Sequence, residues 1–416
     1  MKVIADLHLH SRYARATSKD LDIRALAKWS KIKGVNVVAC GDFTHPRQFE
    51  DVKANLIPDG TGLYDLRDDD SGVKFLMGTE VACIYRHNDS TRRLHHCIFA
   101  PSIEVAEKFN KALTDRGAKL ASDGRPILGM SSKQLLQIML DTDPRMVMVP
   151  AHAWTPWFAI FGSKSGYDTV EECFEDLASH IFALETGLSS DPEMNWAIST
   201  LDKYTLISNS DAHSGPKVGR EANVFELKNL SYDSLISAIK NKNPEEFLYT
   251  IEFFPEEGMY HYDGHRLCHV SLEPSATRKL KNICPVCKKP LTVGVMHRVD
   301  NLRDKEFGRR PEGAIPFKKI IPLPEIIADY FDQGVQSKRV QNLFFSMIQK
   351  FDNEFSILLD ASLDQLKSIA PETLARGIIR VREQKVAITP GYDGVYGKVH
   401  LFDEAEKLAS KQVKLF

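Results

Sequence analysis

Histidines and carboxylates that could hold metal ions recur in this sequence at the ends of short apolar segments. Asp6, His8 and His10 are spaced two residues apart in VIADLHLH, and Asp211 and His213 repeat that spacing in SNSDAH. Because side chains alternate between the two faces of a strand, each set is expected to point to one side. The pattern predicts clustered imidazole and carboxylate ligands.

Six further side chains with nitrogen or oxygen donors lie at or near the ends of other apolar segments. They are Asp42, His45, Glu80, His95, His96 and His152. This mixture suits two or three divalent ions, such as Zn, Mn, Fe or Mg, that share a carboxylate. Clustered ions activate water and hold the attacking and leaving oxygens of a phosphoryl displacement. We therefore predict phosphoester hydrolysis, with a catalytic centre made of Asp211, Glu80, His8 and His10.

A second ligand pattern combines H-x-x-C with C-x-x-C. His265 and Cys268 precede Cys284 and Cys287, and four such ligands complete a tetrahedral structural zinc site that leaves no position open for chemistry. His261, His269 and His297 are alternatives to His265. The remaining cysteines, in apolar segments, are interpreted as core residues: Cys40, Cys83, Cys97 and Cys173.

Positive charge is concentrated around this cysteine knuckle. Twelve Lys or Arg and four Asp or Glu lie between Thr277 and Lys319, so this segment carries +8 and the rest −10 of a total of −2. We expect it to contact DNA phosphates through Lys288, Lys289, Arg298, Arg309 and Arg310. The alternative is a knuckle that only packs domains together.

Aromatic residues follow His152 in AHAWTPWFAIFG. Trp154 and Trp157 could wall a pocket for a nucleotide drawn out of the base stack, whereas Phe161 is interpreted as core.

Seven short β-rich segments, separated by stretches with helical spacing, position these residues. They span 3–10, 35–42, 73–80, 94–100, 147–152, 181–187 and 205–213. This alternation predicts parallel β/α units and a distorted (β/α)7 barrel, whose strand ends would meet at one mouth. We predict a phosphoesterase domain at 1–252, a basic zinc-binding module at 253–322 and a mainly helical domain at 323–416. No apolar run approaches the length of a bilayer span and no leader is evident, so a cytoplasmic location is expected.

The motif order DLHLHS, GD, GTE, HH, PAH and SDAH resembles the polymerase and histidinol phosphatase (PHP) domain over roughly residues 1–250. The resemblance implies eight metal ligands, with Glu80 bridging: His8, His10, Asp42, Glu80, His95, His152, Asp211 and His213. The family's adjacent Asp-His is Asp42-Phe43 here, which makes His45 a substitute candidate. Arginines at 12 and 15 occupy the region where a further ligand is expected.

Over nearly its whole length the chain resembles the endonuclease Q family, through the PHP motifs, the cysteine knuckle and PGYDGVYG near the C-terminus. The resemblance implies a DNA repair nuclease that nicks on the 5′ side of deoxyuridine, hypoxanthine, xanthine and abasic sites. Two other hypotheses are a PHP phosphatase for a small ester and a non-catalytic, zinc-dependent DNA-binding protein.

Overall fold

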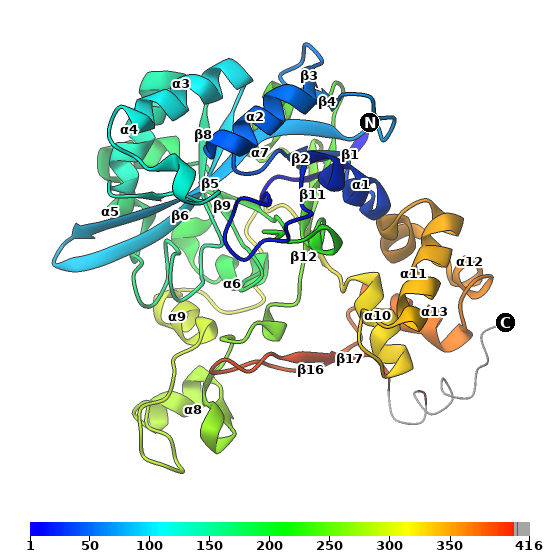
Figure 1. The fold of residues 1–416 in the computed structure, drawn as a ribbon. Coiled ribbons are helices and arrows are strands. Elements are labelled where there is room, and N and C mark those ends of the chain that lie inside the picture. The colour runs from blue at the N-terminus through cyan, green and yellow to red at the C-terminus, as the bar shows by residue number, and fades with distance from the viewer. Residues whose placement is uncertain (403–405, 407–416) are drawn as a thin grey trace.

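A computed structural model describes residues 1–402 and 406 as a large α/β domain, a small cysteine-containing module and a helical region (Figure 1). Positions 403–405 and 407–416 of the predicted C-terminal domain lie outside the described residues. In the part of the chain that the structure describes, no helix combines the length and apolar character needed to cross a bilayer.

The strands of the α/β domain are β1 (Lys2–Asp6), β2 (Val37–Ala39), β3 (Leu56–Pro58), β4 (Tyr64–Leu66), β5 (Lys74–His87), β6 (Ser90–Ala100), β7 (Ile127–Leu128), β8 (Val147–Pro150), β9 (Ala183–Glu185), β10 (Thr205–Ile207), β11 (Ala222–Glu226), β12 (Phe247–Glu252) and β15 (Phe317–Lys319). Outside it lie β13 (Asp263–His265), β14 (Val270–Leu272), β16 (Ala387–Thr389) and β17 (Lys398–His400). All seven predicted segments contain a strand.

One sheet runs in the order β15-β12-β11-β1-β2-β5-β4-β3, and β5 continues through β6 to β8. The parallel pair β9 and β10 stands beside β8. Asn223 on β11 links this pair of strands to the main sheet. Its side chain accepts a hydrogen bond from Ser208 N at 3.0 Å and donates one to Ser208 O at 2.7 Å, and Ser208 directly follows β10. The predicted α/β class and distorted PHP barrel are confirmed.

The distortion has a local cause. β6 pairs antiparallel with both β5 and β8, where a regular β/α unit would be parallel. Asn88 and Asp89 have positive φ angles of 49° and 58°, which make a tight hairpin turn possible in place of a crossover helix.

Helices cover the sheet and form the C-terminal region. They are α1 (Ile23–Lys33), α2 (Pro46–Asn55), α3 (Ile103–Thr114), α4 (Ser132–Thr142), α5 (Val170–Phe174), α6 (Pro192–Trp196), α7 (Tyr232–Asn241), α8 (Pro274–Lys279), α9 (Val295–Leu302), α10 (Leu323–Phe331), α11 (Lys338–Phe351), α12 (Leu363–Lys367) and α13 (Glu372–Arg382). Short 3-10 turns occur at Leu120–Ser122, Glu175–His180, Ser199–Leu201, Gly215–Lys217, Pro255–Glu257 and Arg266–Cys268, and a π turn at Ser356–Asp360.

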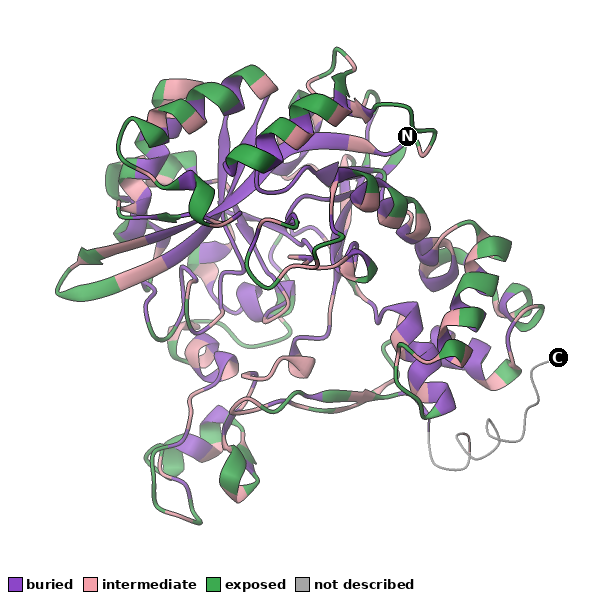
Figure 2. Ribbon diagram, viewed as in Figure 1, coloured by how far each residue is buried: buried purple, intermediate pink, exposed green. Residues whose placement is uncertain are grey.

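Helix α1 illustrates how sequence sets these elements. Asp22 caps its first turn by accepting from Ala25 N at 2.9 Å, and Gly34 ends it with a φ of 88°. Its buried residues recur at helical spacing, so one face packs on the sheet. Figure 2 shows the same division around the central sheet, with buried strands inside and exposed helix faces outside, whereas the hairpin end of β5 and β6 and the strands β16 and β17 are more exposed. The four cysteines predicted as core residues are all buried free thiols.

The C-terminal region is anchored to α1. Lys33, at 3% exposure, donates to Glu354 Oε2 at 2.5 Å, while Glu354 Oε1 accepts from Leu323 N at 2.8 Å. Asn353 packs directly against Gly34. The beginning and the last quarter of the chain are therefore joined by a buried ion pair.

Three strands connect regions on either side of the predicted domain boundaries, and those boundaries stay a proposal. β15 belongs to the predicted module but pairs in parallel with β12 of the main sheet. β16 and β17 form an arm that reaches from the helical region to the module, where Tyr392 pairs with Tyr262 (Figure 1). The module is therefore held from both sides.

Candidate metal centre and adjoining surfaces

The barrel mouth gathers ligand-type side chains from strand ends. His8 and His10 follow β1, His152 follows β8 and Asp211 follows β10. Three residues of this region have positive φ values: Asp42 (48°), His152 (30°) and Asp211 (46°). Non-glycine residues rarely adopt this conformation, and such strain concentrates at functional sites.

A first group consists of His8, His10, Glu80 and Asp211, whose ligand atoms lie within 4.8 Å of one another. His10 Nε2 is 3.2 Å from Glu80 Oε2 and 3.1 Å from Asp211 Oδ1, and His8 Nε2 is 3.5 Å and 3.6 Å from the same two oxygens. Both Nε2 atoms and Asp211 Oδ1 are buried without a hydrogen bond among the described residues. Buried polar atoms that converge in this way fit a cation.

A second group consists of Glu80, His95 and His152. Glu80 Oε1 is 2.7 Å from His95 Nδ1 and 3.1 Å from His152 Nε2. Glu80 therefore offers one carboxylate oxygen to each group. This is the arrangement expected of a carboxylate between two metal ions.

Burial shapes the charge of this centre. It would raise the pKa of the Glu80 carboxyl, but the charges of His95, Arg125 and His8 hold that pKa well below its usual range. Burial lowers the pKa of His95 to about 4. The ionised carboxylate of Glu80 and the neutral imidazole of His95 are protonation states that bind metal.

Two carboxylates orient the histidines of the first group. Glu185 Oε1 and Oε2 lie 3.1 Å and 3.0 Å from His8 Nδ1, and Oε2 also accepts from His152 N at 2.8 Å. Asp42 Oδ1 lies 2.9 Å from His10 Nδ1. Such partners fix the tautomer that directs Nε2 toward a metal. The sequence reasoning missed Glu185, although it ends an apolar segment in ALETG as Glu80 does in MGTE.

Four predicted ligands stand outside both groups. Asp42 supports His10. His45 is the N-cap residue before α2, and its ring stacks on Tyr13 at 4.7 Å. His213 lies against the ring of His10 at 4.4 Å, with its Nδ1 2.9 Å from Asp211 O. The fourth is His96, which the sequence left as the alternative to His95 for metal ligation.

Strand alternation decides between these two histidines. His96 is fully buried on the opposite face of β6, where its Nε2 lies 2.7 Å from Ser132 Oγ. Ligation by His96 is therefore wrong, and His95 faces Glu80.

The two tryptophans after β8 have different environments. Trp154 is 1% exposed, donates from Nε1 to Asn195 Oδ1 at 2.8 Å and packs on Phe161, so its prediction as a DNA-contacting wall is wrong. Phe161 is core, as predicted. Trp157 is 41% exposed and meets Tyr260 edge to face at 5.8 Å.

Trp157 lines a pocket of about 260 Å³ between the barrel and the cysteine module. Thr155, Tyr260 and His261 contribute to the same walls. Thr155 Oγ1 lies 3.2 Å from His152 Nδ1, so the pocket adjoins the metal-ligand groups.

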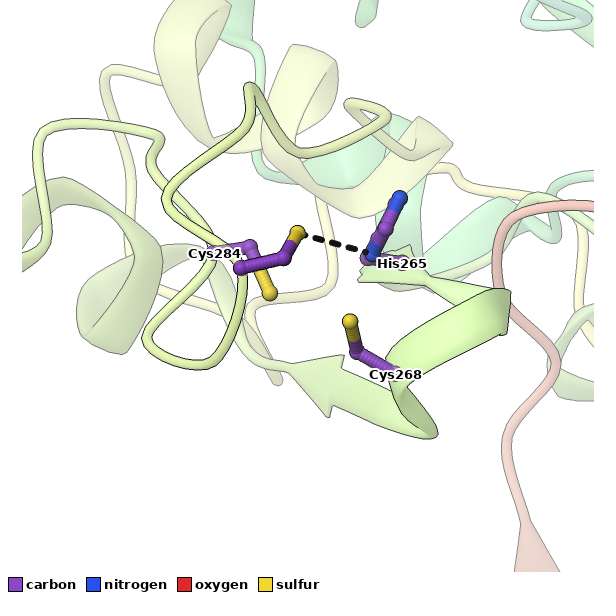
Figure 3. A group of neighbouring side chains, drawn as sticks. His265, Cys268 and Cys284 are labelled. Atoms are coloured by element: carbon purple, nitrogen blue, oxygen red, sulfur yellow. Dashed lines mark hydrogen bonds between the residues drawn. The ribbon is translucent and has the colours of Figure 1, made fainter.

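His265, Cys268, Cys284 and Cys287 also come within 4.8 Å of one another. Figure 3 shows the labelled side chains converging from a short hairpin and a facing turn. Cys284 N donates to Lys289 O at 2.8 Å and Lys288 N donates to Cys284 O at 3.0 Å, which closes the knuckle turn. His261, His269 and His297 do not join this group. Three thiols and one imidazole fit a tetrahedral structural ion.

The predicted phosphate contacts divide into two kinds. Lys288 and Lys289 are exposed on the knuckle. Arg298 is instead held by Asp168 at 2.6 Å and by two backbone carbonyls, and Arg309 pairs with Asp202. Arg298 and Arg309 are therefore already paired with protein groups, and their contact with phosphate stays a prediction. Arg310 is exposed and donates to Ala314 O at 3.0 Å.

The barrel and the paired ligand groups at its mouth define a PHP-type, metal-dependent phosphoesterase class. The structure matches a crystal structure of the lesion-specific endonuclease PfuEndoQ from Pyrococcus furiosus, with a TM-score of 0.86 and 28% sequence identity. The match covers all of this chain and 98% of the PfuEndoQ chain. It also matches endonuclease Q in complex with a 27-mer duplex substrate that carries an abasic lesion, with a TM-score of 0.85, 28% identity and 98% coverage of each chain. The chain therefore resembles endonuclease Q over its whole length.

One family model and two curated relatives also match the sequence. The family model described as the MJ0043 C-terminal domain matches residues 322–385. The protein MJ0043 of Methanocaldococcus jannaschii is 31% identical over 60% of this chain, which spans only 31% of that relative's length. YqxK of Bacillus subtilis is 27% identical over 96% of this chain and 99% of its own.

Proposed function

We propose that this protein is a DNA repair endonuclease that hydrolyses the phosphodiester on the 5′ side of deaminated bases and abasic sites. The observation that carries the proposal is the pair of ligand groups sharing Glu80, within a chain that matches endonuclease Q from end to end. The substrates would be DNA containing deoxyuridine, hypoxanthine, xanthine or an abasic site, and the setting would be the cytoplasm.

Two divalent ions fit the proposed centre, one in each ligand group. Bound there, they would supply an activated water and charge stabilisation for the phosphoryl displacement. Glu185 and Asp42 would keep the imidazoles of His8 and His10 in the orientation that ligation requires. We assign a further, structural zinc to the group of His265 and three cysteines.

The pocket beside His152 supports recognition of an extruded nucleotide. Trp157 and Tyr260 give it flat apolar walls, which suit stacking on a base. Exposed Lys288 and Lys289 are suited to hold the DNA backbone next to it.

The test is a nicking assay on matched duplexes that differ only by one deoxyuridine, hypoxanthine or abasic site, with Mn, Mg or Zn supplied. We expect one nick on the 5′ side of each lesion, leaving a 3′-hydroxyl and a 5′-phosphate, and no cut in the undamaged duplex. Asp211→Asn should retain DNA binding but cut at less than about a tenth of the parent rate, a loss of more than ~1.4 kcal/mol. It removes the charge beside His10 and leaves the lysine surface intact.

Two results would contradict the proposal. One is equal treatment of lesion and undamaged duplexes by the metal-loaded protein. The other is hydrolysis confined to small phosphate esters.

A further inference from the structure

Arg125 places a permanent positive charge inside the metal-ligand cluster. Its Nη1 donates to Glu80 Oε2 at 3.0 Å, and this is the oxygen nearest His8 and His10. The Arg125 side chain is 25% exposed, whereas that of Glu80 is fully buried. One end of the guanidinium thus touches the cluster, while a quarter of the side-chain surface stays exposed.

The loop that carries Arg125 is fixed on both sides. Gly124 N donates to Tyr13 O at 3.0 Å, and Ala82 N, on the strand that carries Glu80, donates to Pro126 O at 3.0 Å. The backbone of Gly124 lies so close to Asp42 that a Cβ atom would be 2.5 Å from Asp42 Oδ2. Any other residue at 124 would push this loop away from the cluster.

The composition of the candidate ligand groups bears on the role of the Arg125 guanidinium. The sequence predicted two or three ions, and the barrel gathers two ligand groups that share Glu80 and a third, fully buried group of His8, Cys97 and Glu185. None of the three groups includes Asp42 or His45. The loop of Arg125 lies against Asp42 instead. A guanidinium has a fixed charge and five N–H donors, and among the described residues this one donates only to Glu80. Its other N–H donors have no partner among the described residues, so they are available to an anion.

We propose that Arg125 is a catalytic residue that binds a non-bridging oxygen of the scissile phosphate, in place of a third metal ion. This inference rests on the proposed function and adds a residue to it. In the hydrolysis, the water oxygen bonds to phosphorus, the bond from phosphorus to the 3′-oxygen breaks, and that oxygen leaves with a proton. Negative charge grows on the non-bridging oxygens in between, and a fixed donor stabilises it without reorganisation.

The test compares Arg125→Gln and Arg125→Lys with the parent, and uses Arg116→Gln as a charge-matched control. Arg116 is exposed after α3, and in the described structure its side chain donates only to Ala112 O. We expect Arg125→Gln to slow single-turnover nicking about a hundredfold, equivalent to ~2.7 kcal/mol, with Arg125→Lys intermediate and Arg116→Gln unchanged. Metal analysis should find the same number of ions in all four proteins.

A second measurement does not depend on DNA. Titration of the metal-loaded proteins with inorganic phosphate should show binding at least about tenfold weaker in Arg125→Gln than in the parent. This arm still tests Arg125 if the parent nicks no DNA, a result that would refute only the proposed function. Thermal melts identify any variant that does not fold, in which case Arg125→Lys supplies the comparison.

The proposal is overturned by nicking within about threefold of the parent, or by unchanged phosphate affinity. Loss of bound metal in parallel with activity would also overturn it, because Arg125 would then only position Glu80.

Discussion

Trp154 and Trp157 lie three residues apart in one loop, and the same substitution should affect them differently. Trp157→Ala removes an exposed ring from the pocket beside His152, whereas Trp154→Ala opens a hole in the core under Asn195 and Phe161. If the pocket receives an extruded base, Trp157→Ala should impair cleavage at deoxyuridine and hypoxanthine more than at an abasic site, which has no base to stack.

The sizes of the two effects follow from burial. One base stacked on an aromatic ring contributes ~1 to 3 kcal/mol, which corresponds to roughly five- to hundredfold in rate. Trp157 is 41% exposed, so its removal should leave the melting temperature nearly unchanged. Trp154 is 1% exposed, and truncation of such a core residue costs ~3 to 5 kcal/mol of stability.

The assay is a set of single-turnover nicking rates on deoxyuridine, hypoxanthine and abasic duplexes, paired with a thermal melt of each variant. Trp154→Ala is the matched control, because it should lower the melting temperature and affect all substrates together. Equal losses for Trp157→Ala on base-containing and abasic duplexes would refute the pocket role. A lowered melt for Trp157→Ala would show that the ring is structural.

Two other predictions concern metal and pH. Replacing Cys284 and Cys287 together with Ser should release about one zinc per chain and destabilise the module, whereas Cys173→Ser should release none; unchanged zinc in the double variant would exclude this site. Burial, and then the charge of Asp191, raises the pKa of Glu252 from 4.5 to about 8, so the native state binds more protons than the unfolded chain between these values. The contribution of Glu252 to stability is therefore full below about pH 4.5 and is lost as pH rises through about 8; Glu252→Gln should melt higher than the parent at about pH 8, and a parent melt that is flat from about pH 5 to 8 would contradict this.

The ligand-bearing strand ends could be predicted because each lies beside an apolar run. His8, His10 and Asp211 could be predicted as ligands from their spacing alone, and the cysteine knuckle could be predicted from its C-x-x-C motif. Glu80 is found through the same juxtaposition, since GTE ends a β-rich segment. Local sequence was therefore sufficient to predict most of the ligand residues of the metal centre.

Pairings between distant residues could not be predicted. Arg125 reaches Glu80 from a loop 45 residues away, and Arg298 and Arg309 are neutralised by Asp168 and Asp202 from the barrel. The basic segment therefore carries less free charge than its composition indicates. The choice between His95 and His96 could not be made from the sequence, because alternation along a strand defines two faces but does not show which face meets the metal centre.

The ion pair between Lys33 and Glu354 has a consequence for how the protein is made. The two residues are 321 positions apart, so helix α1 leaves the ribosome long before its partner exists. Until then Lys33 has to stay in water, because burying an unpaired charge costs several kcal/mol, a large share of the ~5 to 15 kcal/mol that stabilises a domain. The packing of the C-terminal region against α1, which pairs Glu354 with Lys33, can therefore form only after most of the chain has been synthesised.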